Sequence, residues 1–73
     1  MTYDIRLIAK QSHMHYRRMT KLLAEFGWII RFKDLEIIIN HDYLTWDHQR
    51  LCFTEKGVIE FNLNLIEKFR GGN

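Results

Sequence analysis

The sequence predicts a single small domain of the α+β class, with two helices, a β-hairpin and a C-terminal helix. Apolar side chains recur at helical spacing through the first 27 residues, and β-branched and aromatic residues dominate from Trp28 onward. The chain has 73 residues, no proline and no glycine- or serine-rich linker, so we expect one unit over residues 1–73. Hydrophobic residues make up 47% of it, which is enough to build a core.

The first 27 residues predict two helices joined by a tight corner. Thr2 is an N-cap candidate for a first helix that runs to about Lys10, with Asp4 near the positive end of its dipole. Ser12 is the N-cap candidate of the second helix, and Gly27 provides its C-terminal stop. The apolar stripe of the second helix comprises Tyr16, Met19, Leu22, Leu23 and Phe26. Residues 2–27 therefore predict a helix-turn-helix.

The face of the second helix opposite this stripe is basic. A rotation of roughly 100° per residue places Arg17 and Lys21 there, flanked by His13, Arg18 and Thr20. Arginine can bond guanine bidentately, while lysine, threonine and histidine reach phosphates or base edges. The residue types fit a helix that reads a DNA groove. A basic, solvated helix face without a ligand is the alternative interpretation.

The net charge of +2 is unevenly distributed along the chain. Residues 1–27 carry +3, and residues 28–73 carry −1. The positive charge therefore lies on the predicted helix-turn-helix, where a phosphate-binding surface needs it.

Residues 28–54 predict extended structure, which we interpret as one hairpin with a long tip. A β-branched and aromatic run from Trp28 to Ile39 precedes a polar stretch, and Leu51 and Phe53 then share one face of a strand. Residues 30–49 fit an enlarged wing, an extra strand or a short helix over residues 34–40. We favour strands.

The final segment, residues 55–70, fits two patterns. Ile59, Phe61, Leu63 and Leu65 alternate with polar residues as in a strand. A helical stripe is also present, and its members are Val58, Phe61, Leu65 and Phe69, with Ile66 beside them. Thr54 can cap that helix, with Glu55 in its first turn.

Two motifs resemble those of a winged helix-turn-helix DNA-binding domain, in particular small archaeal-type transcription regulators. In that family the recognition helix ends L-x-x-x-G-x-I, and the last strand runs into L-T-E-K-G. MHYRRMTKLLAEFGWI matches the first motif and CFTEKG the second, with Phe53 in place of the usual leucine. The resemblance spans about residues 2–70. It implies an enlarged hairpin wing over residues 28–54 and a C-terminal helix over residues 55–70.

The sequence departs from the family pattern in two places. The family usually has another helix before the helix-turn-helix, whereas only Met1 precedes the first helix here, and residues 30–49 exceed the usual short wing. In a C-terminal helix, Ile59 and Leu63 lie off the main stripe, and a second apolar face favours a partner. We therefore expect a homodimer through Ile59, Leu63 and Ile66. A wide, monomeric core helix is the alternative.

Other chemistry has little support in the sequence. His13, His15, His41, Asp42, Asp47, His48 and Cys52 are metal-ligand types, but their spacing matches no strong metal signature. Cys52 is the single cysteine, on a strand where it could face solvent, and no phosphate-cradling glycine loop occurs. We expect no enzyme activity, cofactor or metal. Without an apolar run of about 20 residues, we expect no membrane association and a cytoplasmic location.

Two functions therefore compete. The first is a dimeric, sequence-specific transcription regulator that places its second helix in the major groove of double-stranded DNA. Its expected DNA contacts are His13, His15, Tyr16, Arg17, Arg18, Thr20, Lys21 and, from the wing, Lys33, His48 and Arg50. The second is a winged-helix protein-interaction module, encoded for example by a virus or mobile element, that binds a host polymerase or regulator.

Overall fold

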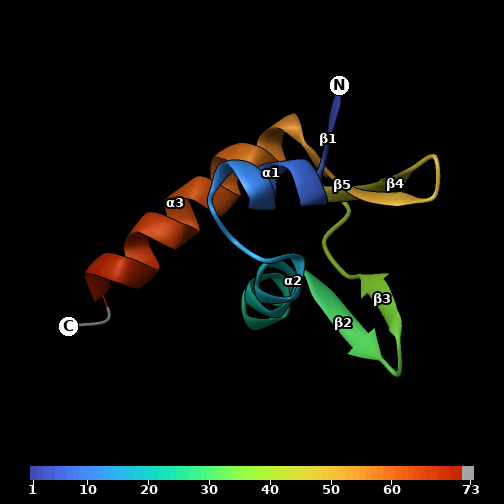
Figure 1. Cartoon of the computed structure of the whole chain (residues 1–73), viewed down its shortest axis with the longest axis horizontal. Coiled ribbons are helices and arrows are strands. Elements are labelled where there is room, and N and C mark those ends of the chain that lie inside the picture. Colours follow the sequence, from blue (N-terminus) through green and yellow to red (C-terminus); the bar gives the residue numbers. More distant parts are fainter. Residues whose placement is uncertain (72–73) are drawn as a thin grey trace.

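A computed structural model describes residues 1–71, which form an α+β fold with three helices and two antiparallel sheets (Figure 1). In chain order the elements are β1 (Thr2–Asp4), α1 (Ile5–Gln11), α2 (Tyr16–Glu25), β2 (Ile29–Phe32), β3 (Leu35–Ile38), β4 (Leu44–Asp47), β5 (Arg50–Thr54) and α3 (Glu55–Gly71). The larger sheet has the strand order β1-β5-β4, and β2 and β3 form a separate two-stranded sheet.

The prediction of two helices joined by a tight corner is correct in outline and wrong at both helix starts. Residues 2–4 form β1, which pairs with β5, so Thr2 lies opposite Thr54 in a strand and does not cap a helix. Asp4 caps α1, because its Oδ1 accepts a hydrogen bond from the Arg6 N–H at 2.9 Å. His15, and not Ser12, caps α2: its Nδ1 accepts from the Arg17 N–H at 3.1 Å.

The end of α2 agrees with the sequence prediction. Gly27 has φ +80°, a left-handed conformation that glycine adopts without a Cβ penalty. The chain then enters β2, and the Trp28 N–H still bonds the carbonyl of Leu23 at 3.0 Å. Gly27 therefore changes the direction of the chain between helix and strand.

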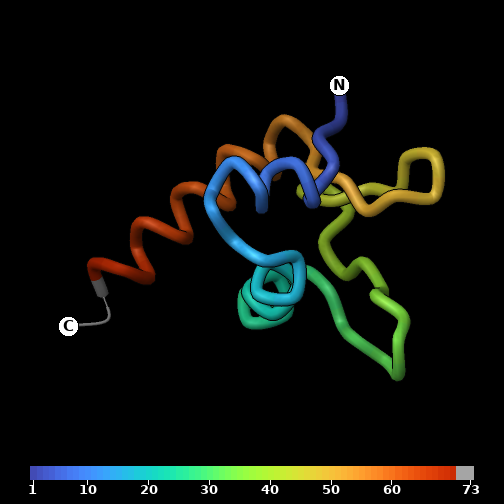
Figure 2. Tube along the Cα trace, viewed as in Figure 1, coloured from blue at the N-terminus to red at the C-terminus, as the bar shows by residue number. Residues whose placement is uncertain are grey.

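Residues 28–54 form strands, as favoured, but they form two hairpins and not one enlarged hairpin. Lys33 and Asp34 connect β2 to β3, while His48 and Gln49 connect β4 to β5. The chain turns between the hairpins at Asn40, whose side chain accepts hydrogen bonds from the Asp42 and Tyr43 N–H groups at 3.0 and 3.2 Å. The two hairpin tips point in different directions (Figure 2).

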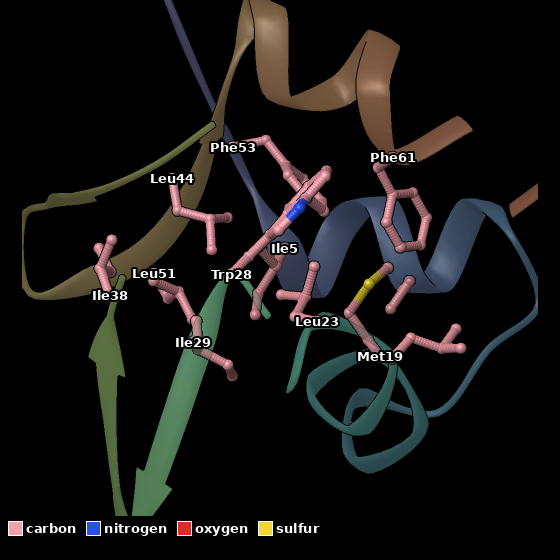
Figure 3. Packing of buried hydrophobic residues seen from close by; sticks show 12 residues of the cluster. Ile5, Met19, Leu23, Trp28, Ile29, Ile38, Leu44, Leu51, Phe53 and Phe61 are labelled. Atoms are coloured by element: carbon pink, nitrogen blue, oxygen red, sulfur yellow. The ribbon is translucent and has the colours of Figure 1, made fainter. Parts of the chain in front are cut away.

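The core lies between the three-stranded sheet and the helices (Figure 3). Leu44, Leu51 and Phe53 project from β4 and β5, and α2 contributes Met19 and Leu23 from its predicted stripe. The Phe53 ring packs against that of Phe61 on α3, with centroids 5.2 Å apart. These contacts remove the inner faces of the sheet and of helices α2 and α3 from water, which is the main stabilisation of so small a domain.

The C-terminal segment is a helix, so the alternative strand interpretation is wrong. Thr54 caps it as predicted: its Oγ1 accepts from the Gly57 N–H at 3.0 Å and donates to the Asp42 carbonyl at 2.6 Å. Gly57 is required by packing, because a Cβ there would lie 1.9 Å from the Tyr43 carbonyl oxygen.

The predicted apolar stripe of α3 holds only over its first part. Phe61 is fully buried, and Val58 and Leu65 are half-buried. Phe69 is 69% exposed, which contradicts its assignment to the core stripe. The reason is geometric, since the last turns of α3 extend beyond the body of the domain (Figure 1).

Candidate nucleic-acid interface

The corner between α1 and α2 fixes the direction of the second helix. His13 has φ 55°, an uncommon left-handed conformation for a residue with a side chain. The Met14 N–H then bonds the Ala9 carbonyl at 2.8 Å, which ties the corner to the end of α1. Ile5 and Ala9 on α1 pack into the core with Met19 and Leu23 of α2. The opposite side of α2 is thereby left in solvent.

Exposed side chains between the N-cap and the middle of α2 form a group that we call the basic cluster. It consists of His15, Arg17, Arg18 and Lys21, which surround a shallow surface depression of about 390 Å³. Within the described residues, the side chains of Arg17, Arg18 and Lys21 form no hydrogen bond or ion pair. They therefore present three cationic groups on one side of a helix, with donors available to a ligand.

The acidic residue nearest this cluster on the helix is partly neutralised by α3. Glu25 Oε2 accepts a hydrogen bond from Lys68 Nζ at 2.9 Å. This hydrogen bond and the charge of Lys68 lower the pKa of Glu25, with smaller contributions from Lys21 and Arg18. Lys68 therefore reduces the repulsion that Glu25 would exert on an approaching phosphate.

Two residues predicted to contact DNA are engaged within the protein. Thr20 is 1% exposed and its hydroxyl donates to the Arg17 carbonyl at 3.1 Å, so its assignment to the outward face is wrong. On the helix it lies between Tyr16 and Leu23, and this places it beside the core stripe. Tyr16 is half-buried, with the Arg6 guanidinium 4.1 Å from its ring centroid. Burial and the neighbouring Glu36 carboxylate raise the pKa of Tyr16.

The β4-β5 hairpin carries two further predicted contacts. His48 and Gln49 form its turn with φ values of 50° and 63°, as a type I′ turn requires. The exposed His48 Nδ1 lies 2.6 Å from Asp47 Oδ1, and Arg50 Nη1 lies 3.3 Å from Asp4 Oδ2. Hydrogen bonds from Thr2 and His48 lower the pKa of Asp47. Acidic groups therefore partly offset the positive charge of this hairpin.

Lys33 lies apart from these groups. It occupies the tip of the β2-β3 hairpin with φ 58°, while His48 and Arg50 belong to the β4-β5 hairpin. Because the tips diverge (Figure 1), the structure does not bring these three residues together as one wing. His13 is exposed at the corner between α1 and α2.

A cleft between the start of α2 and the β4-β5 hairpin brings Arg6 and Trp46 next to two of the predicted DNA contacts. It measures about 360 Å³, and its lining includes Arg6, Tyr16, Trp46 and Arg50 together with the acidic residues Asp4 and Glu36. Trp46 is 51% exposed, so its ring can stack on a base or sugar. The sequence signal for Arg6 was its place in the basic first 27 residues. Trp46 could be placed beside α2 only by the fold.

Cys52 does not face solvent as the sequence allowed. It is buried in β5, between Asp4 on β1 and Thr45 on β4. Burial, and then the charges of Asp4 and Asp47, raise the pKa of its thiol, which disfavours the nucleophilic thiolate. Within residues 1–71, no group of three or more histidine, cysteine or acidic residues is placed to hold a metal ion.

The three residues predicted to form a dimer interface are exposed on α3. Ile59, Leu63 and Ile66 are 60%, 55% and 53% exposed, and their spacing of four and three residues places them along one side of the helix.

None of the described helices combines the length and the apolar character that crossing a bilayer requires. No protein-family model matches the chain, and no match is found among curated proteins or solved structures.

Proposed function

We propose that this protein is a winged helix-turn-helix regulator that binds double-stranded DNA in a sequence-specific manner. The observation that carries the proposal is the basic cluster, whose side chains are exposed from the N-cap of α2 to its middle, with Arg17 and Arg18 in the N-terminal half. That half is the part of such a unit that enters the major groove. Arg17 and Arg18 have the donors for guanine or phosphate, and Lys21 provides a point charge for phosphate.

The arrangement of the strands supports the winged-helix part of the proposal. The strand before α1 pairs with β5, and β5 pairs with β4, so the β4-β5 hairpin is held against the helix-turn-helix. This order is compatible with a winged helix in which β4-β5 is the wing and β2-β3 is an insertion after the recognition helix. The wing would then contact DNA through His48 and Arg50, with Trp46 and Arg6 beside α2.

A homodimer completes the proposed regulator. Helix α3 exposes Ile59, Leu63 and Ile66, and an antiparallel pair of α3 helices centred near Leu63 would cover these residues on both copies. Dimerisation places two recognition helices on one DNA duplex, so that the two half-sites are bound together. Burial of this face also adds stability to a domain whose own core is small.

A double substitution in the basic cluster tests the proposal. Arg17→Ala with Lys21→Ala should weaken binding to duplex DNA about tenfold or more, because each side chain contributes a phosphate or base contact. The matched control is Lys10→Ala with Lys56→Ala, which removes the same charge from exposed positions on α1 and α3. Fluorescence anisotropy with labelled duplex DNA measures both. Equal losses for the two pairs would contradict the assignment of the reading surface.

One observation favours a protein-interaction module as the second candidate. Asp47 lies next to the turn of the proposed wing, and Asp4 lies beside Arg50, so this region is less attractive to phosphate than α2. A winged helix can bind a host polymerase or regulator in place of DNA. Recovery of one stoichiometric protein partner, with no retention on heparin at low salt, would support this candidate against the first.

A further inference from the structure

The β2-β3 hairpin has one face that is entirely apolar and exposed. The register pairs Ile30 with Ile37 and Phe32 with Leu35, and alternation places all four side chains on the same face. Their exposed fractions run from 48% for Ile37 to 65% for Leu35. We call these four residues the hairpin face.

The other face of the same hairpin is occupied. Ile29 and Ile38 are buried in the core, and Glu36 lines a cleft together with Tyr16 of α2. The hairpin is therefore anchored through one side, and the hairpin face is directed away from the domain. An isolated two-stranded hairpin is marginally stable, and apolar patches of this kind mark interaction surfaces.

We propose that the hairpin face is a homotypic contact surface that packs against the same face of a second copy of this chain. The hairpin contains two basic and two acidic residues, Arg31, Lys33, Asp34 and Glu36, so its net charge is zero. A hairpin with zero net charge does not repel a second copy of itself, and it has no net electrostatic attraction to a polyanion or an anionic membrane. A charged turn at Lys33 and Asp34 also disfavours insertion into lipid.

The size of the hairpin face sets the strength of this contact. Four half-exposed Ile, Leu and Phe side chains present roughly 400 Å² of apolar surface, so two copies bury roughly 800 Å². This area is below that of stable dimers and belongs to weak, transient association. Face-to-face packing covers these side chains, whereas pairing along the open edges of β2 or β3 would leave them in water.

The hairpin face and the exposed residues of α3 can be used at the same time. Helix α3 and the β2-β3 hairpin lie on opposite sides of α2 (Figure 2). Two different two-fold contacts on one chain connect dimers to one another. This step depends on the α3 dimer of the proposed function. If two copies pair through α3, the hairpin face would join dimers bound at neighbouring DNA sites and make DNA binding cooperative.

Sedimentation velocity of the full chain without DNA, from about 5 µM to 1 mM, tests the contact. We expect a dimer that associates further as concentration rises, and Phe32→Thr with Leu35→Thr should weaken that second step about tenfold or more. Ile30→Thr with Ile37→Thr removes the other pair of the hairpin face and should act in the same way. Threonine keeps a high strand propensity at these exposed positions, so both variants should fold.

A matched variant on α3 separates this contact from the proposed dimer. Ile59→Gln with Leu63→Gln removes two apolar side chains that are about as exposed as those of the hairpin face. It should abolish the dimer formed through α3 and leave the weaker association through the hairpin face. If the α3 variant behaves like wild type while the hairpin variant becomes monomeric, the hairpin contact stands and the α3 dimer is wrong. The proposal would be overturned if the sedimentation of wild type did not depend on concentration, or if both hairpin variants associated as strongly as wild type. The hairpin face would then bind a different partner.

Discussion

The two hairpins of this protein have similar strands and short turns but different surroundings. The β4-β5 hairpin is extended by β1, Leu44 and Phe53 are fully buried in the core, and the Phe53 ring packs against Phe61 of α3. The β2-β3 hairpin has no third strand among the described residues, and Phe32 and Leu35 are 60% and 65% exposed. Apolar strand residues therefore stabilise the fold in one hairpin and remain available for association in the other.

In this protein, β-propensity and alternation do not by themselves decide which face of a strand is buried. That decision depends on which helix lies over the sheet, and α3 covers β5 but does not reach β2-β3 (Figure 1). The same substitution in the two hairpins should therefore have very different consequences.

The largest difference is expected for phenylalanine truncation. Phe53→Ala should lower the free energy of unfolding by about 3 to 5 kcal/mol, because it removes a fully buried ring and leaves a cavity beside Phe61. Phe32→Ala should cost less than about 1 kcal/mol, because its ring is largely in water. Urea denaturation of both variants measures the difference. Similar losses would show that the β2-β3 hairpin is packed more tightly than the structure indicates.

A glycine substitution tests the junction between the β4-β5 hairpin and α3. Gly57→Ala should destabilise the fold by about 2 to 3 kcal/mol, because its Cβ would overlap the Tyr43 carbonyl oxygen. Gly27→Ala, at the start of the β2-β3 region, should cost about 1 kcal/mol, since only its φ of +80° is unfavourable and nothing lies within 4 Å of the added Cβ. Thermal unfolding compares the two. A Gly57→Ala protein as stable as wild type would contradict the close approach.

Turn substitutions should give a smaller, stabilising effect that again differs between the hairpins. His48→Asn with Gln49→Gly should raise the free energy of unfolding by about 1 kcal/mol, because both positions have positive φ in a type I′ turn. Lys33→Gly relieves a similar φ of 58°. It should change global stability less, because the β2-β3 hairpin contributes less to the core. Urea midpoints decide between these outcomes.

The pH dependence of stability should show the smallest difference. The pKa of Asp47 is lowered in the folded state, so its contribution is present above its unfolded pKa and is lost as pH falls through the lower folded value. Asp47→Asn should therefore reduce the loss of stability between pH 7 and acid. Asp34→Asn is the control, since Asp34 accepts no hydrogen bond within the described residues. Equal pH profiles for both variants would contradict the role of the Thr2 and His48 contacts.

The features predicted correctly from the sequence are those set by local physical chemistry. The stripe of Met19, Leu22 and Leu23 defined α2, and Gly27 and Thr54 marked a helix end and a helix start. Each of these signals depends on residues within about one or two helical turns. The arginines and lysine of the basic cluster followed from the same periodicity, and the structure places them in solvent.

The features missed depend on distant partners or on unusual caps. The strand β1 has three residues and becomes a strand only through pairing with β5, so no period could indicate it. His15 caps α2 through a ring nitrogen, which takes the role usually filled by a serine or aspartate oxygen. Thr20 was misplaced because the buried stripe is wider than its apolar residues alone indicate.

The proposed function requires that the basic cluster on α2 binds the phosphates and bases of duplex DNA. Its most direct test is a titration of random-sequence duplex DNA, followed by anisotropy at 50 and 200 mM salt, for wild type and for the Arg17→Ala, Lys21→Ala double variant. We predict that wild-type affinity falls steeply with salt. In the double variant, the negative slope of log K against log salt should become shallower by about 2. Binding that is absent at low salt, or an unchanged slope in the variant, would contradict the account.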